Sequence, residues 1–205
     1  MVLAGTFALV QTDESIKDFS QSIRNENLDI PMYFGTLYGE PYTPFIIGTG
    51  LIISGNSGNE KNKRIGFEIL QTTLYSATLT QLIKVSLGRS RPYNNEGALN
   101  FTFFNISSDG FWSMPSGHTD VAFSTSSVLA LNTDNTWMKI LYFTPAFITG
   151  ISRIYHNKHW ASDVFLGAAI GYFTAKFVHN LHNENSFQKD LVIPNSNIFK
   201  FSIPL

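Results

Sequence analysis

Apolar residues recur at three- and four-residue steps through residues 61–90, which is the period of an amphipathic helix. The Arg91-Pro92 pair ends the pattern, because the residue before a proline is disfavoured in the α region. The patterning predicts further helices at 116–131, 137–155 and 160–181, and weaker ones at 14–24 and 28–53. The fold class expected from this order is all-α, as a single-domain helical bundle.

One segment without a clear period interrupts the helices, and one helix carries a run of small residues. Residues 93–114 mix Asn, Gly, Ser and aromatic residues, and a loop of this length is usually a functional segment. In the last helix, the small residues that suit close packing are Gly167, Ala168, Ala169 and Gly171.

The composition is that of a folded protein, with 43% hydrophobic and 14% charged residues among 205. A chain of this length forms one domain with a workable core. No nucleic-acid partner is expected, because such binding needs clustered Lys and Arg and the formal net charge is −1. The absence of cysteine removes disulfides, thiolate nucleophiles and Cys-ligated zinc.

No stretch of the sequence has the composition of a membrane-spanning helix, which needs about 18 or more apolar residues. Residues 41–59 are uncharged but include two Pro, four Gly and two Asn. Residues 1–10 are apolar but lack the basic start of a secretory signal. Three interpretations of that segment stay open: a signal remnant, an expression scar or a short docking segment.

Two cations and one helix start are candidate anion-binding groups. Lys84 and Arg91 are seven residues apart, which is two helical turns, so both can project from one side of the helix end. Ser116, Gly117 and His118 open a predicted helix, where unpaired N–H groups and the positive dipole end suit a phosphate. Taken separately, exposed cations and an ordinary serine N-cap explain both features.

A third group contains Arg153, His159 and Asp163. Asp163 follows His159 by four residues, one helical turn, so its carboxylate can reach the imidazole. A carboxylate bonded to Nδ1–H leaves the Nε2 lone pair free to attack and stabilises the positive ring that results. Alone, such a pair is more often structural, but the three groups in this order favour phosphoryl chemistry.

Together the three groups resemble the signature of the type-2 phosphatidic acid phosphatase superfamily. That signature reads Lys, six residues, Arg-Pro; then Pro-Ser-Gly-His; then Ser-Arg, five residues, His, three residues, Asp. Here the parts are KVSLGRSRP at 84–92, PSGH at 115–118 and SRIYHNKHWASD at 152–163, and every position matches. The first 55 residues and the tail carry no motif.

The resemblance implies a helical bundle of the phosphatase and haloperoxidase type. Helical segments at 1–60 would pack on a catalytic helical core at 61–182, and an irregular tail would follow at 183–205. The phosphoryl oxygens would be bound by Lys84, Arg91, Ser116, Gly117 and Arg153.

The resemblance also implies the division of chemical roles. His159 would attack phosphorus, Asp163 would orient it, and His118 would protonate the leaving oxygen and later activate water. Neither a metal site nor a cofactor is expected, because cations can position and neutralise the phosphoryl oxygens directly.

The function expected is a phosphatase acting on phosphate esters: a lipid phosphate, an isoprenyl diphosphate or a related phosphomonoester. One alternative is a vanadium-dependent haloperoxidase, whose vanadate pocket resembles this site; the short chain and the string HWASD at 159–163 favour the phosphatase. A further alternative is a non-catalytic helical bundle that binds phospholipid, but such a binder needs neither histidine nor the orienting aspartate.

The partner expected is therefore a phosphorylated small molecule or lipid. Integral members of the family have several spanning helices, which the short, polar-interrupted segments here do not provide. A periplasmic protein, or one peripheral on the outer face of the cytoplasmic membrane, is favoured over an integral one. The aromatic residues of the long loop fit either a lipid contact or the core.

Overall fold

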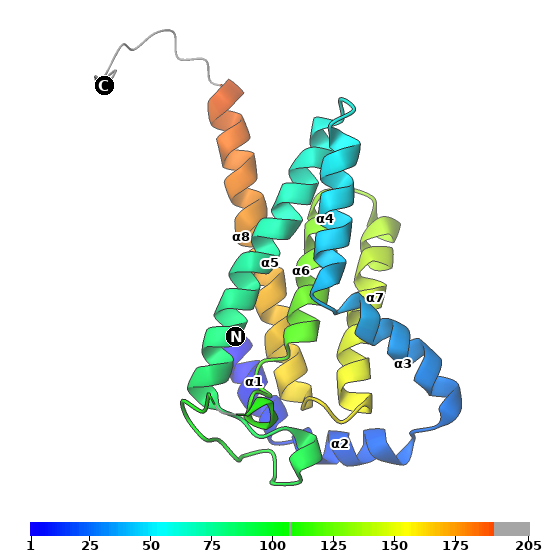
Figure 1. The fold of residues 1–205 in the computed structure, drawn as a ribbon, viewed down its shortest axis with the longest axis vertical. Helices are drawn as coiled ribbons and strands as arrows, with labels where there is room; N and C mark the ends of the chain where they lie inside the picture. Colours follow the sequence, from blue (N-terminus) through cyan, green and yellow to red (C-terminus); the bar gives the residue numbers. More distant parts are fainter. Residues whose placement is uncertain (107, 191–205) are drawn as a thin grey trace, which may run out of the picture.

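The computed structural model describes residues 1–106 and 108–190, and this part of the chain is a bundle of α-helices (Figure 1). The helices are α1 Val2–Val10, α2 Asp13–Ser22, α3 Glu26–Tyr38, α4 Tyr42–Gly55, α5 Glu60–Leu87, α6 Gly117–Leu131, α7 Thr136–Tyr155 and α8 Ala161–Asp190. The described residues contain no β-strand, and their only bridge joins Arg89 to Phe101. The all-α prediction is confirmed.

Helix α6 is the centre of the bundle and packs against α5, α7 and α8. Its residues from Thr119 to Val128 are all buried. The small-residue face predicted on α8 explains the close packing, since a Cβ at Gly167 would lie 2.4 Å from the Ser116 carbonyl oxygen. A Cβ at Gly171 would lie 2.5 Å from the Asp120 carbonyl oxygen. The α6 and α8 backbones therefore meet without intervening side chains.

The single helix predicted at 28–53 is wrong, because the chain forms two helices there, α3 and α4. Gly39 ends α3, and Pro41 is the N-cap of α4. The break has a packing cause: a Cβ at Gly39 would lie 2.8 Å from the His118 carbonyl oxygen, so only glycine allows this approach. The turn brings the following residue, Glu40, to the start of α6.

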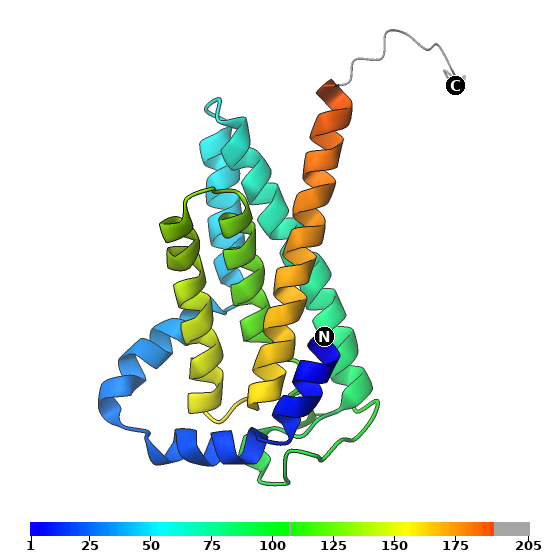
Figure 2. The same cartoon turned by 180° about the vertical axis from the view of Figure 1, so that it is seen from behind.

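Helices α1 and α2 bring the N-terminal residues to the end of the bundle where α6 and α8 begin. Helix α1 packs beside α8, and α2 crosses below the ends of α7 and α8 (Figures 1 and 2). Asn25, the N-cap of α3, accepts a hydrogen bond from the Asn27 amide and lets the chain turn back up the bundle. Residues 2–10 of the apolar start thus form a helix that packs on α8.

The irregular tail predicted from 183 onward is wrong for residues 183–190, which continue α8. Residues 191–205 of that prediction lie outside the described residues. The helices predicted at 116–131 and 137–155 are confirmed to within one residue. Over the described ranges, no helix has the length and apolar character needed to cross a bilayer.

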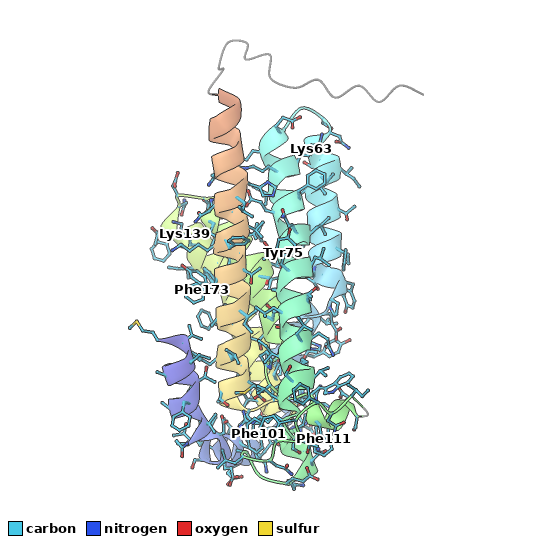
Figure 3. The ribbon with its side chains drawn as sticks, turned by 90° about the vertical axis from the view of Figure 1, so that its left-hand side faces the viewer. Lys63, Tyr75, Phe101, Phe111, Lys139 and Phe173 are labelled. Carbon is cyan, nitrogen blue, oxygen red and sulfur yellow. The ribbon has the colours of Figure 1, made fainter. Side chains whose placement is uncertain are left out.

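Many large apolar side chains on the sides of the bundle are exposed to solvent. Tyr75 of α5 and Phe173 of α8 lie at mid-height, between Lys63 and Lys139 toward one end and Phe101 and Phe111 at the other (Figure 3). Beyond Arg64, the next charged residues of α5 are Glu68 and Lys84, and both are buried. The exposed sides of α5 between these ends are therefore free of charge.

Candidate active site

The predicted site residues meet at one end of the bundle. Helices α6 and α8 begin there, α5 and α7 end there, and the long loop between α5 and α6 covers it (Figure 1). That loop contains two short 3-10 turns, Pro92–Asn94 and Asp109–Phe111. Residues separated by up to 80 positions are thereby brought into one buried polar region.

His159 is buried and its ring is oriented by a backbone group. Nδ1 lies 2.7 Å from the Ser113 carbonyl oxygen, which can only accept, so Nδ1 carries the proton. Nε2 then holds a lone pair, and the Arg91 guanidinium lies 3.5 Å from it. Burial, opposed by Asp163 and assisted by the charges of Lys84 and Arg91, lowers the pKa of His159 well below its usual value. The ring is therefore neutral, with its lone pair on Nε2.

The expectation that Asp163 bonds directly to Nδ1–H is wrong in detail. The Asp163 Oδ2 atom is 3.7 Å from Nδ1, farther than the Ser113 carbonyl, and it accepts hydrogen bonds from the Ser113 hydroxyl and the Trp160 amide. Burial raises the pKa of Asp163, but Arg89, followed by His159 and the Ser113 hydroxyl, lowers it to about 2. Asp163 is thus a fixed anion that holds the segment around His159.

Lys84 and Arg91 converge on the site, but not through the helical spacing expected. Helix α5 ends at Leu87, and Gly88 follows with φ 56°, a left-handed conformation that suits glycine. Arg91 therefore lies in the loop, where its guanidinium donates to the Asp109 carboxylate at 2.7 Å. Burial, followed by the charge of Arg91, lowers the pKa of Lys84 to about 7.

Arg153, the third cation predicted to bind phosphate, is also buried, on the last turn of α7. Its Nε–H is buried without a hydrogen-bond partner, and Nη1 lies 3.5 Å from the Thr36 hydroxyl. Burial and the charge of Arg91 lower the pKa of Arg153 to about 10, so the guanidinium stays charged at neutral pH. The charge of Arg91 acts on both Lys84 and Arg153, so the Arg91 guanidinium lies near each of them.

The start of α6 is capped as predicted. The Ser116 hydroxyl accepts from the Thr119 amide and lies 2.9 Å from the Thr119 hydroxyl, so this fully buried side chain is engaged in the cap. A Cβ at Gly117 would lie 3.7 Å from Cε of Lys84. The lysine side chain therefore passes beside the amino-terminal turn of α6, where the helix dipole favours an anion.

His118 has an acidic partner that no motif indicated. Its Nε2 atom lies 3.2 Å from the Glu40 carboxylate, and both side chains are about one-third exposed or less. Burial and the charge of Arg153 lower the pKa of His118 to about 4, although Glu40 opposes this shift. The carboxylate therefore supports the protonated form of His118 in a strongly positive site.

A cavity of about 770 Å³ opens from the site and runs between α4, α5 and α6. Lys84, Gly117 and His118 lie at its catalytic end. Apolar and aromatic residues line much of the rest, among them Phe45, Phe67, Leu70, Leu74, Tyr75 and Val121. This volume suits a hydrocarbon chain attached to a group held by the cations.

One buried carboxyl, Asp120, lies in the wall of this cavity. It accepts a hydrogen bond from the Thr80 hydroxyl at 3.1 Å, one turn before Lys84 on α5. Burial raises the pKa of Asp120 to about 7 despite this hydrogen bond and the nearby Lys84 charge. In the described part of the chain, no group of three His, Asp or Glu side chains has the arrangement of a metal site.

Sequence reasoning missed several residues of this site. Glu40 and Asp13 are far from every motif in the chain. Ser113 contributes its backbone carbonyl, and because every residue has one, the sequence does not mark this group. Arg89 received no role from the sequence, but it is fully buried and paired with two carboxylates. The one available signal was that Arg89 lies inside the first motif, between Lys84 and Arg91.

The fold and the buried polar site define a class: an all-α protein with histidines and cations gathered at one end of a bundle. The family model of the PAP2 superfamily matches residues 66–187, more than half of the chain. The chain therefore belongs to the PAP2 superfamily, as the motifs predicted.

Relatives and solved structures agree with this assignment. The chain is 38% identical over 94 residues to a lipid A 1-phosphatase of Porphyromonas gingivalis, covering 44% of this chain and 21% of that one. It is 29% identical over 140 residues to an undecaprenyl-diphosphatase of Sulfolobus acidocaldarius, covering 68% and 64%. The chain thus spans about a fifth of the first relative and just under two thirds of the second.

Two crystal structures share the fold. Aquifex aeolicus LpxE matches with a TM-score of 0.60 and 24% identity, over 82% of this chain and 94% of that one. A transmembrane PAP2 type phosphatidylglycerolphosphate phosphatase from Bacillus subtilis matches with a TM-score of 0.67 and 20% identity, over 89% and 94%.

Proposed function

We propose that this protein is a phosphatase that hydrolyses a lipid phosphate through a phosphohistidine on His159, without a metal ion. The observation that carries the proposal is the state of His159. Its Nδ1–H is held by the Ser113 carbonyl, and its Nε2 lone pair lies among buried cations. A neutral, oriented imidazole beside an anion-binding site is what in-line attack on phosphorus requires.

In the first step, the Nε2 lone pair forms a bond to phosphorus while the bond from phosphorus to the leaving oxygen breaks. Lys84, Arg91 and Arg153 hold the three equatorial oxygens, and the amino-terminal turn of α6 adds the Gly117 amide. Ser116 acts mainly by capping that turn. Asp163 stabilises the positive ring that attack produces.

His118 acts as the general acid and then as the general base. As the imidazolium it gives a proton to the leaving oxygen, and as the neutral base it then takes a proton from the attacking water. Water attack breaks the phosphorus–nitrogen bond and releases phosphate. A bound phosphate dianion raises the low pKa of His118, because its negative charge offsets that of Arg153.

The cavity supports a lipid as the substrate. Its catalytic end contains Lys84 and His118, so a chain in the cavity would present its phosphate to His159. The names of the two relatives, lipid A 1-phosphatase and undecaprenyl-diphosphatase, describe enzymes of amphiphilic phosphates. A lipid phosphate or isoprenyl diphosphate is therefore proposed ahead of a small soluble phosphomonoester.

The proposed location is periplasmic or peripheral on the outer face of the cytoplasmic membrane. Exposed aromatic side chains at mid-height of the bundle, such as Tyr75 and Phe173, support contact with lipid (Figure 3). Cell fractionation without detergent tests this location. Release from the membrane by high salt or carbonate supports a peripheral protein, and retention after both contradicts it.

A panel of lipid and water-soluble phosphates, assayed with the wild type and His159→Ala, tests the function. We expect loss of turnover in the variant, inhibition of the wild type by orthovanadate, and no effect of EDTA. His156→Ala is a matched control, because His156 lies three residues away and packs on the Tyr155 ring outside the site.

Two results would contradict the proposal. Wild-type turnover by His159→Ala would exclude His159 as the nucleophile. Halide oxidation with added vanadate and peroxide, without ester hydrolysis, would assign the chain to the haloperoxidase side of the family.

A further inference from the structure

A buried carboxylate from the N-terminal region lies behind the active site. Asp13 is the first residue of α2 and is fully buried. Its Oδ1 atom accepts the Ser162 amide at 2.9 Å, and Oδ2 accepts the Ser162 hydroxyl and the Arg89 guanidinium at 2.7 Å. Asp13 therefore contacts the first turn of α8, immediately before Asp163.

Arg89 joins this carboxylate to the one beside His159. It donates from Nη2 to Asp13 at 2.7 Å and from Nη1 to Asp163 at 2.6 Å. The remaining N–H groups donate to the Ala98 carbonyl and the Ser162 hydroxyl. All three charged side chains are fully buried, so the planar guanidinium fixes their relative positions.

Asp13, Arg89 and Asp163 form a buried charge cluster, and its net charge affects the charge state of His159. Two carboxylates and one guanidinium give −1, located on the Asp163 side of His159. Lys84 and Arg91 lower the pKa of His159, so they oppose a positive charge on the ring. A ring bonded to phosphorus at Nε2 is positive, and a net negative cluster stabilises that state. Without the Asp13 charge, the cluster is neutral.

We propose that Asp13 is a positioning residue of the active site, acting on His159 through Arg89 and Asp163. The proposal rests on the proposed function, in which His159 is the nucleophile. It also gives a catalytic purpose to a segment that lies outside residues 66–187, the part matched by the family model. Helix α2 would then be a component of the active site.

Asp13→Asn tests the proposal, because it keeps the shape of the side chain and removes its charge. We expect kcat to fall roughly tenfold or more, while KM stays within about threefold and competitive inhibition by inorganic phosphate is unchanged. Asp13→Glu, which restores the charge, should recover part of kcat. Asp18→Asn is the matched control, since Asp18 is an exposed acid on the same helix.

All variants are assayed well below their unfolding midpoints, so that kcat refers to folded enzyme. Ser162→Ala is a second variant, which removes one hydroxyl but leaves both ion pairs of Arg89. Its kcat should stay within about threefold of the wild type. A tenfold loss in Ser162→Ala would contradict the electrostatic role even if Asp13→Asn did not fold.

Wild-type kcat in folded Asp13→Asn would overturn the proposal, as would a parallel loss of kcat and phosphate inhibition, which would indicate general disruption of the site. The His159→Ala variant separates this failure from failure of the proposed function. Inactive His159→Ala with fully active Asp13→Asn rejects only the role of Asp13. Active His159→Ala rejects the phosphohistidine mechanism itself.

Discussion

The Nε2 atom of His118 lies 3.2 Å from the carboxylate of Glu40, a residue that no motif includes. The contact exists because Gly39 packs against the His118 backbone and so places the next residue beside the imidazole. The charges of Arg153 and Arg91 oppose protonation of His118, and the Glu40 carboxylate is the group that favours it. Its removal should therefore weaken the proposed general acid.

Glu40→Gln should lower kcat by about tenfold for substrates with alkyl leaving groups, because the pKa of His118 falls further. The loss should be smaller for p-nitrophenyl phosphate, whose leaving oxygen needs less protonation. Steady-state kinetics with both substrates check this difference. Glu26→Gln, an exposed acid on the preceding helix, is the control. Equal losses for both leaving groups would contradict an acid role.

The pH dependence of kcat/KM should reflect Lys84, whose pKa is lowered to about 7 by burial and by the charge of Arg91. Above that pH the free enzyme loses the ammonium proposed to bind phosphate, so kcat/KM should decline as pH rises through about 7. Lys84→Arg should move this decline to higher pH, because guanidinium stays charged. A pH–rate profile of both enzymes measures the shift, and an unmoved alkaline limb would exclude Lys84 as its origin.

The buried carboxyl of Asp120 should make the folded state less stable at alkaline pH. Its pKa is raised to about 7 from 3.8, so the stability it contributes is complete below the unfolded value and is lost as pH rises through about 7. Between pH 5 and pH 8 this loss is about 3 kcal/mol.

Urea unfolding of the wild type and Asp120→Asn at these two pH values measures the difference. The free energy of unfolding should fall less with pH in Asp120→Asn than in the wild type, while Asp18→Asn should follow the wild type. The same pH dependence in both Asp120→Asn and the wild type would show that another group is responsible.

Gly167→Ala should destabilise the protein by about 2 kcal/mol, since the added Cβ would lie 2.4 Å from the Ser116 carbonyl oxygen. The contact joins α8 to the start of α6, so activity should fall together with stability. Gly50→Ala is the control, because no atom lies within 4 Å of its added Cβ and alanine favours helix. Thermal unfolding of the two variants measures the difference. Equal unfolding midpoints for Gly167→Ala and Gly50→Ala would show that the contact between α6 and α8 accommodates the added methyl group without loss of stability.

The sequence by itself determined the helical fold class, most helix positions and the family. Helical periodicity and cap residues indicated α5 through α8, and the small residues Gly167 and Gly171 of α8 do pack against α6. The motifs named Lys84, His118 and His159, because these residue types can bind a phosphoryl group or exchange protons with it. These properties are local, or recur at fixed spacing, and so they can be read along the chain.

The tertiary structure alone decided how the named residues are held. Glu40 reaches His118 through a turn at Gly39, and the Ser113 carbonyl, not Asp163, is the nearest acceptor for the His159 ring. Asp13 meets Arg89 from a segment without a motif. Such contacts join residues that are distant in sequence. A backbone carbonyl is present in every residue, so the residue type does not indicate which carbonyl is used. Periodicity and spacing do not encode them, because they depend on which helix ends the packed bundle brings together.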